Sequence, residues 1–220
     1  MMAAVRALAR PGRPPRRWVV TALVLLAASG ALIALTIAAG VSWHGNPARY
    51  FGERKFGTYL SFGVLIASAV VCGMIARRLG PVRSRRFWIG AAALFGWVAC
   101  DDLFVFHERA DRFLHALLGW DPDNRLTDHG DDAIVAVYGV VAAVLAYRHR
   151  HHLLGFPWMM LTMAAAFGCF SVMVVYDVMH WSKAIEDSLK VVAGTLIVVA
   201  LLAAYFDPAI AARPAARAPS

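Results

Sequence analysis

The sequence predicts an all-α fold, a polytopic membrane helix bundle of about six transmembrane helices with its N- and C-termini in the cytoplasm. The first observation is composition: 60% of the 220 residues are hydrophobic, against roughly 45–50% in soluble domains. The second is a mean hydropathy of +0.59. The third is that the apolar residues gather in six runs, and a membrane-spanning helix needs roughly 20 apolar residues. The length therefore allows six spans and leaves no room for a second, soluble domain.

Charged and turn residues bound the six runs, as expected for helices that end at a membrane surface. The runs cover residues 18–41, 56–75, 88–106, 133–147, 157–180 and 185–206. The fourth is short for a full span, so we expect its helix to begin among the polar residues near Asp131. The domain plan is a disordered basic cytoplasmic tail over 1–17, a six-helix transmembrane domain over 18–207 and a disordered cytoplasmic tail over 208–220.

Basic residues set the expected orientation of these spans. The first run follows an arginine-rich segment and is too long for a cleaved signal peptide, so we interpret it as a retained signal anchor. Alternate loops carry 14 and 8 of the 22 Lys and Arg residues, with the larger number on the side of the termini. Because Lys and Arg stay on the cytoplasmic side, we expect a multi-pass protein of the inner (plasma) membrane.

The net charge of +8 does not indicate nucleic-acid binding, because the basic residues lie in short clusters between apolar runs. We therefore expect the lipid bilayer, and no nucleic acid, as a partner. The three cysteines lie inside apolar runs, fit no zinc motif and are interpreted as small hydrophobic side chains. The oligomeric state is left open.

The acidic residues are distributed far more unevenly than orientation requires. Of 14 Asp and Glu residues, only Asp207 lies at a predicted cytoplasmic helix end. Acidic residues contribute little to topology, so this asymmetry asks for another explanation. Ordinary helix capping, ion pairing and solvation account for part of it. Ionisable side chains inside a span are costly and point to function by default.

The third run ends in two carboxylates followed by a histidine and a glutamate. In a continuous helix, Asp101 and Glu108 differ by about 20° around the axis and share a face with His107 nearby. The structural alternative is that Asp102 pairs with Arg109, seven residues further on, while Glu108 is a solvated charge.

The segment 121–132 is dense in carboxylates and resembles an EF-hand only in part. Arg125 and Leu126 occupy positions where that loop needs an oxygen ligand and a glycine, so calcium binding is not expected. Capping of the fourth helix accounts for two or three of these residues. His129 and Asp132 are our candidate metal ligands here.

The fifth run ends, and the sixth begins, with further polar pairs. Asp177 and His180 are spaced i and i+3, the spacing with which bundle metal sites take two ligands from one helix. A simple Asp–His hydrogen bond is the alternative. Glu186 and Asp187 each lie within one turn of Lys190, which predicts an ion pair with one of the two acids.

These clusters fall at the extracytoplasmic ends of helices 3–6, where a bundle brings them around one cavity. Such donors suit a divalent metal, either zinc or a di-iron or di-manganese centre. The expected metal ligands are His107, Glu108, His129, Asp132, Asp177 and His180. The expected catalytic residues are Asp101, Glu108, Glu186, Asp187 and Lys190.

These features favour a metal-dependent enzyme of hydrolase or oxidase type that acts on a lipid-like substrate. No nucleophile motif or phosphate-binding loop accompanies the cluster. Two alternatives stay open. One is a non-catalytic membrane scaffold or assembly factor whose acidic face binds a basic partner. The other is a proton-coupled transporter, against which the apolar cytoplasmic halves of the spans count.

Two short motifs carry a resemblance to a known group of proteins. They are DDLFVFHE at residues 101–108 and EDSLK at 186–190. Together they resemble bacterial multi-pass membrane proteins of uncharacterised function, from the third span onward, and this resemblance implies no activity. The chain is only loosely similar to alkaline ceramidase-like membrane hydrolases, which use intramembrane His and Asp residues around zinc. It has six predicted spans rather than seven, and Glu186 and Asp187 replace the paired histidines of their last span.

Overall fold

The computed structural model of this chain describes residues 13–51, 55–79, 83–119, 130–179, 182–207 and 210, with the backbone alone at 83, 130–132, 177 and 178. Over these residues the secondary structure is entirely helical. The long helices are α2 (Arg16–His44), α3 (Phe56–Arg78), α4 (Arg83–Phe104), α6 (Gly130–Arg148), α8 (Pro157–Val178) and α9 (Lys183–Tyr205). Two short helices, α5 (Phe106–Leu118) and α7 (Arg150–Leu153), lie between them in the sequence.

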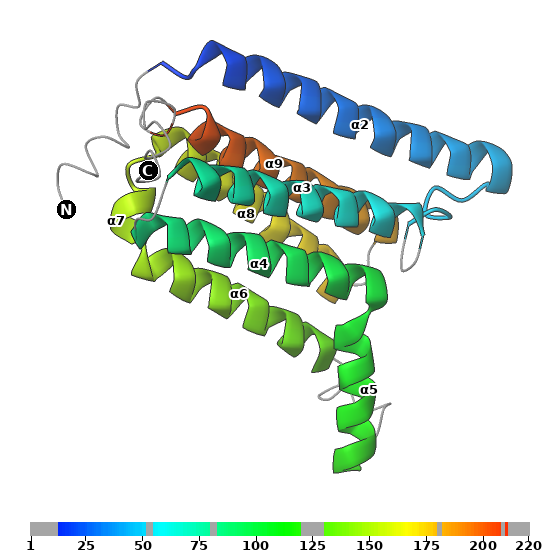
Figure 1. Cartoon of the computed structure of the whole chain (residues 1–220). Coiled ribbons are helices and arrows are strands. Elements are labelled where there is room, and N and C mark those ends of the chain that lie inside the picture. Colours follow the sequence, from blue (N-terminus) through cyan, green and yellow to red (C-terminus); the bar gives the residue numbers. More distant parts are fainter. Residues whose placement is uncertain are drawn as a thin grey trace.

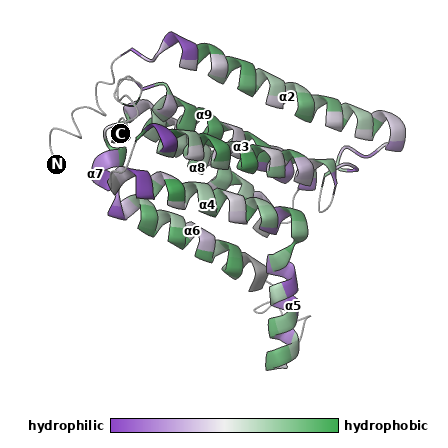
Figure 2. Cartoon of the chain, in the orientation of Figure 1, coloured by the Kyte–Doolittle hydropathy of each residue, from purple (hydrophilic) through white to green (hydrophobic). Residues whose placement is uncertain are grey.

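The long helices run side by side and form a bundle (Figure 1). Within the described residues, α2, α3, α4, α8 and α9 are each long and apolar enough to cross a membrane. The apolar part of α6, Ala133–Arg148, is shorter, as the sequence predicted. Figure 2 shows hydrophobic residues along the helices and hydrophilic ones gathered at helix ends. The predicted all-α polytopic bundle is confirmed, and the chain is an integral membrane protein.

The bundle has two ends, which we name by the helices that begin and end there. We call the end where α2 begins and α9 ends the termini end, and the opposite end, where α4 leads into α5, the α5 end (Figure 1). The predicted tails lie almost entirely outside the described residues, so the domain plan stays a prediction.

The apolar core lies at the termini end. Trp88 and Ile75 are fully buried there among side chains from α2, α3, α4 and α9. The indole N–H of Trp88 donates to His152 Nε2 at 3.1 Å, and that of Trp18 donates to the Val199 carbonyl oxygen at 2.8 Å. Each bond satisfies a polar atom that apolar packing would otherwise leave unpaired.

The third predicted helix is broken where the sequence predicted continuity. Helix α4 ends at Phe104, and Val105 adopts the left-handed conformation with φ 58° and ψ 46° before α5 begins. Figure 1 shows α5 running across the end of the bundle rather than continuing along α4. The prediction that Asp101 and Glu108 share one helix face is therefore wrong, because they belong to helices with different axes.

Candidate functional site

A cavity of about 170 Å³ lies inside the α5 end of the bundle. Its walls come from α3, α4, α6, α8 and α9, with the first turn of α5 at its edge. Most of the lining is apolar. The polar and charged lining residues are Ser61, Asp101, Asp102, His107, Tyr138 and Lys190. Four of these were singled out from the sequence, and the structure brings those four together.

Asp101 and His107 form the first of two pairs of ionisable side chains in this cavity. The buried carboxylate of Asp101 accepts the backbone N–H of His107 at 2.8 Å through Oδ1. Its Oδ2 accepts a second hydrogen bond, from the ring Nδ1 of His107, at 2.8 Å. Because a carboxylate only accepts, the Nδ1 atom carries the proton, and in the neutral ring Nε2 has the free lone pair. Asp101 thus fixes both the orientation and the tautomer of His107.

The turn at Val105 makes this pairing geometrically accessible. A carboxylate six residues before a histidine in a straight helix lies well over a turn away, whereas the break brings the first turn of α5 over Asp101. Asp101 then acts as a cap from outside α5, because it satisfies an N–H that the helix itself leaves unbonded. Left-handed backbone is unfavourable for a β-branched residue, and such strained residues cluster at functional sites.

Aromatic side chains brace the same turn. The ring of Phe106 stacks on that of Phe104 with 5.6 Å between centroids and on that of Trp97 with 6.0 Å. Such offset contacts add to the area burial that holds the turn in place. The strained conformation at Val105 is therefore supported from the outside by these rings and from the inside by the Asp101 carboxylate.

Asp102 and Lys190 form the second pair. The ammonium of Lys190, on α9, donates to Oδ1 of Asp102, on α4. The Asp102 side chain is 11% exposed and that of Lys190 37% exposed. Oδ2 of Asp102 is buried without a hydrogen-bond partner among the described residues. Most buried acceptors in proteins are hydrogen-bonded, so this oxygen is an exception.

This pairing corrects two sequence-based alternatives. Asp102 does not pair with Arg109, and Lys190 does not pair with an acid of its own helix. Glu186 instead bonds Lys183 at 2.8 Å, and Glu108 lies 3.5 Å from Arg112. Both are pairs within one helix that do not reach the cavity. Asp187 lies near the start of α3, where its Oδ2 is 3.6 Å from the place a side chain at Gly57 would occupy.

The expected metal ligands are only partly covered by the structure. His129 and His180 lie outside the described residues, and Asp132 and Asp177 are described by backbone alone. Among the side chains that are described, no group of three or more His, Cys, Asp or Glu residues is placed to hold a metal ion. The divalent metal therefore stays a prediction.

Two lining residues were missed by the sequence analysis. Ser61 and Tyr138 are polar residues inside otherwise apolar runs, and each faces the cavity from a different helix. Isolated hydroxyls are common in membrane helices, where they bond to the backbone, so their positions alone carry little signal. Their place in the fold, rather than their spacing, identifies them.

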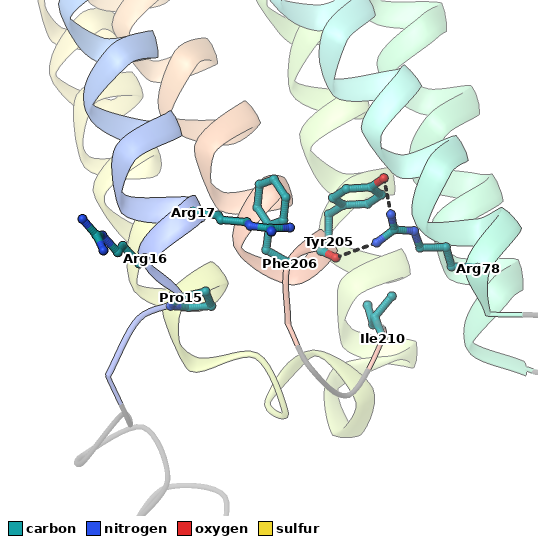
Figure 3. Close-up of a pocket in the computed structure, with 7 residues that line it drawn as sticks. All are labelled: Pro15, Arg16, Arg17, Arg78, Tyr205, Phe206 and Ile210. Atoms are coloured by element: carbon teal, nitrogen blue, oxygen red, sulfur yellow. Dashed lines mark hydrogen bonds between the residues drawn. The ribbon is translucent and has the colours of Figure 1, made fainter. Parts of the chain in front are cut away.

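A second cavity, of about 550 Å³, lies at the termini end (Figure 3). Its basic lining residues are Arg16, Arg17 and Arg78. The guanidinium of Arg78 donates to the backbone oxygen of Tyr205 at 3.2 Å and lies 3.6 Å above its ring. It thereby satisfies a carbonyl at the end of α9 and complements the helix dipole. None of the described lining residues of this second cavity is a carboxylate or histidine.

Comparisons with known proteins add a family but no activity. No curated protein and no solved structure matches this chain. One family matches residues 18–205, from the first turn of α2 to the end of α9, and so includes both pairs of ionisable side chains. The predicted membership of an uncharacterised family is confirmed: the chain belongs to the family described as Domain of unknown function (DUF8692).

Proposed function

We propose that this membrane protein binds a lipid-like substrate at the cavity of its α5 end and hydrolyses an ester or amide bond there. The observation that carries the proposal is the convergence of two pairs of ionisable side chains on one mostly apolar cavity. Asp101 and His107 provide an oriented imidazole, and Lys190 provides a cation held by Asp102. Three separate helices contribute these groups, so the fold itself has to assemble them.

The chemistry follows from the tautomer that Asp101 imposes. Nε2 of His107 takes a proton from water as the water oxygen attacks the carbonyl carbon of the substrate. The bond to the alcohol or amine then breaks, and His107 gives its proton to that leaving group. Asp101 stabilises the imidazolium that exists between the two steps. One water is consumed, an acid and an alcohol or amine are released, and no oxidant is needed.

Lys190 is the group in the cavity suited to the developing negative charge. In a low-dielectric site, a fixed cation near the carbonyl oxygen stabilises the tetrahedral intermediate more than water does. Asp102 holds the ammonium in the cavity.

The size and lining of the cavity favour a lipid-like substrate. At about 170 Å³ it is smaller than the roughly 300–1,000 Å³ of sites that enclose a whole small molecule. It fits the reacting linkage of an amphiphile, with the remainder of the molecule in the bilayer. The topology prediction puts this end on the extracytoplasmic side, so the substrate would come from the outer leaflet.

The rival functions fit the geometry less well. A transporter needs polar groups through the whole depth of the membrane, but an apolar core around Trp88 packs α2, α3, α4 and α9 together. A scaffold that binds a basic partner needs a protruding acidic surface. Asp101 is buried and Asp102 nearly so, and both line the cavity. Inward-facing carboxylates favour chemistry over docking.

The metal-dependent form of the proposal concerns His107 as a ligand through Nε2. Its Nδ1 is already bonded to a carboxylate, the arrangement found in carboxylate–histidine–metal sites. Metal analysis of the purified protein tests this form. A stoichiometric divalent ion that is lost in His107→Ala supports it, whereas protein that turns over lipid without bound metal restricts the proposal to acid–base hydrolysis.

The experiment is turnover of defined lipids by the full chain in phospholipid nanodiscs. Glycerolipids and N-acyl lipids are incubated with the protein, and released fatty acid is measured by mass spectrometry. We expect His107→Gln to lower turnover by about 10²–10⁴-fold, the usual contribution of a general base. His115→Gln is the matched control, because His115 is a second α5 histidine that does not line the cavity. No turnover by the native chain, or equal turnover by His107→Gln, would contradict the proposal.

A further inference from the structure

Helix α5 has its polar and apolar side chains in an unusual arrangement. Asp111 and His115 lie 3.5 Å apart, and their side chains are only 19% and 11% exposed. Phe113 and Leu117, by contrast, are each 66% exposed. The less exposed side of this amphipathic helix is therefore its polar side, and its apolar side faces outward.

Helical geometry separates the two sides clearly. At about 100° per residue, Phe106, Phe113 and Leu117 fall within about 40° of one another. Asp111 and His115 fall on the opposite side of the axis. An amphipathic helix of a soluble protein buries its apolar stripe and exposes its polar face. The reversed arrangement fits a helix whose outer surroundings are hydrocarbon rather than water.

The position of α5 indicates that this hydrocarbon is the surface layer of the bilayer. It begins two residues after α4, a membrane-spanning helix, has ended. It has 13 residues and is therefore roughly 20 Å long, too short to cross a bilayer. Figure 1 shows it extending sideways from the end of the bundle, across the direction of the spanning helices. A helix that leaves a span at the membrane surface and turns sideways lies along that surface.

We propose that α5 is an interfacial helix that lies in the bilayer surface, with its apolar stripe toward the acyl chains of phospholipids. Arg109 and Arg112 are exposed on its flank. Long arginine side chains at this depth reach the phosphate groups, which they bind by charge-assisted hydrogen bonds. The occupant of the exposed face is thus a phospholipid leaflet, bound by apolar burial and by two cations.

The placement of α5 in the membrane surface also affects the position of His107 in the candidate site. His107 is the second residue of this helix, and the Asp101 carboxylate bonds both its backbone N–H and its ring. In the chain, the single left-handed residue Val105 separates α4 from α5. A leaflet that holds α5 in place therefore also holds His107 against the cavity. This consequence depends on the proposed function, but the location of α5 does not.

Spin-label accessibility of the full chain in phosphatidylcholine vesicles tests the location. Single cysteines at 113 and 117 are compared with one at 112, and each label is measured with oxygen and with a water-soluble nickel chelate. We expect the oxygen-to-nickel ratio at 113 and 117 to be several-fold higher than at 112. A label replacing Phe167, an exposed residue on the spanning helix α8, is the reference for acyl chains.

Two outcomes would overturn the proposal. Equal nickel accessibility at 112, 113 and 117 would show a helix in water. Exclusion of both reagents at 113 and 117 would show that protein, such as a second copy of the chain, covers the stripe.

The native cysteines are replaced by alanine. If the fully buried Cys72 is needed for folding it is kept, because a buried thiol does not react with the label. The readout is independent of lipid turnover.

Discussion

The two ends of the bundle differ in the side chains that pack between the helices. At the termini end, large aromatic side chains such as Trp88 and Phe156 pack between the helices, and a cavity of about 550 Å³ lined by arginines lies at the same end. At the α5 end, small residues such as Ala99 and Ala193 are buried and a cavity of about 170 Å³ remains. In lipid, helices associate mainly through close packing, because the lipid tails are as apolar as the helix side chains. The termini end therefore combines an aromatic core with an arginine-lined cavity, whereas the α5 end has paired carboxylates in a smaller, mostly apolar cavity.

The ionisable side chains that line the cavity at the α5 end are paired across elements rather than along one helix. Asp101 joins α4 to α5, and Asp102 joins α4 to α9. Each pair keeps a charge inside the bundle at a cost that pairing offsets only in part. Substitutions at the two ends therefore test different contacts: core packing at the termini end, and pairing and close approach around the cavity at the α5 end.

The largest expected effect is at the termini end. Trp88→Ala leaves a large void in the core and removes the donor to His152, so we expect a loss of about 3–5 kcal/mol in the free energy of unfolding. Denaturant titration in detergent measures it. Phe167→Ala is the control, because that ring faces outward and its loss should change stability by less than about 0.5 kcal/mol. Equal effects of the two would contradict the placement of the core.

The second prediction concerns the ion pair between α4 and α9. Lys190→Met leaves the Asp102 carboxylate nearly buried and unpaired, and we expect a loss of about 2 kcal/mol. This is below the usual range for buried pairs because Lys190 is partly exposed and screened. Asp102→Asn alone should cost less, since the ammonium can reach water. Adding Asp102→Asn to Lys190→Met should recover most of the loss, and a purely additive double variant would contradict direct pairing.

The third prediction concerns the close approach of α3 and α9 beside the cavity. A Cβ at Gly194 would lie 2.9 Å from Cγ1 of Val64, whose branched side chain has little freedom to move. We expect Gly194→Ala to lower stability by about 1–3 kcal/mol through overpacking. Gly63→Ala is the matched control on α3, where nothing lies within 4 Å of the added atom. Thermal unfolding of the two variants in the same detergent decides between them.

The fold was predictable because a membrane imposes a simple rule on sequence. Runs of apolar residues of spanning length become helices, and the six predicted runs correspond to the long helices of the bundle. The break at Val105 was not predictable, because the surrounding segment contains neither glycine nor proline. The break is accompanied by two local side-chain contacts that spacing does not predict: the carboxylate of Asp101 caps α5, and the ring of Phe106 stacks on that of Phe104.

The candidate site was predictable in its members but not in its pairing. Asp101, Asp102, His107 and Lys190 stood out because ionisable residues are rare within apolar runs. Partners were sought within one helix, at spacings that bring side chains together on a helix surface. The structure instead pairs residues 88 positions apart in the case of Asp102 and Lys190. Such contacts follow from how helices pack, which spacing along one chain segment does not encode.

The smallest expected effect is at Val105, the turn between α4 and α5. Val105→Gly removes a buried side chain, worth about 2 kcal/mol, but relieves a left-handed conformation that costs a β-branched residue about 1–2 kcal/mol. The two terms nearly cancel, so we expect stability to change by less than about 1 kcal/mol. Val191→Gly is the matched control: this valine is equally buried but lies in the regular helix α9. There glycine loses the same packing and adds about 1 kcal/mol of helix cost, for a total of about 3 kcal/mol. Urea or detergent titration of both variants measures the difference, and equal losses would mean that the turn stores no strain.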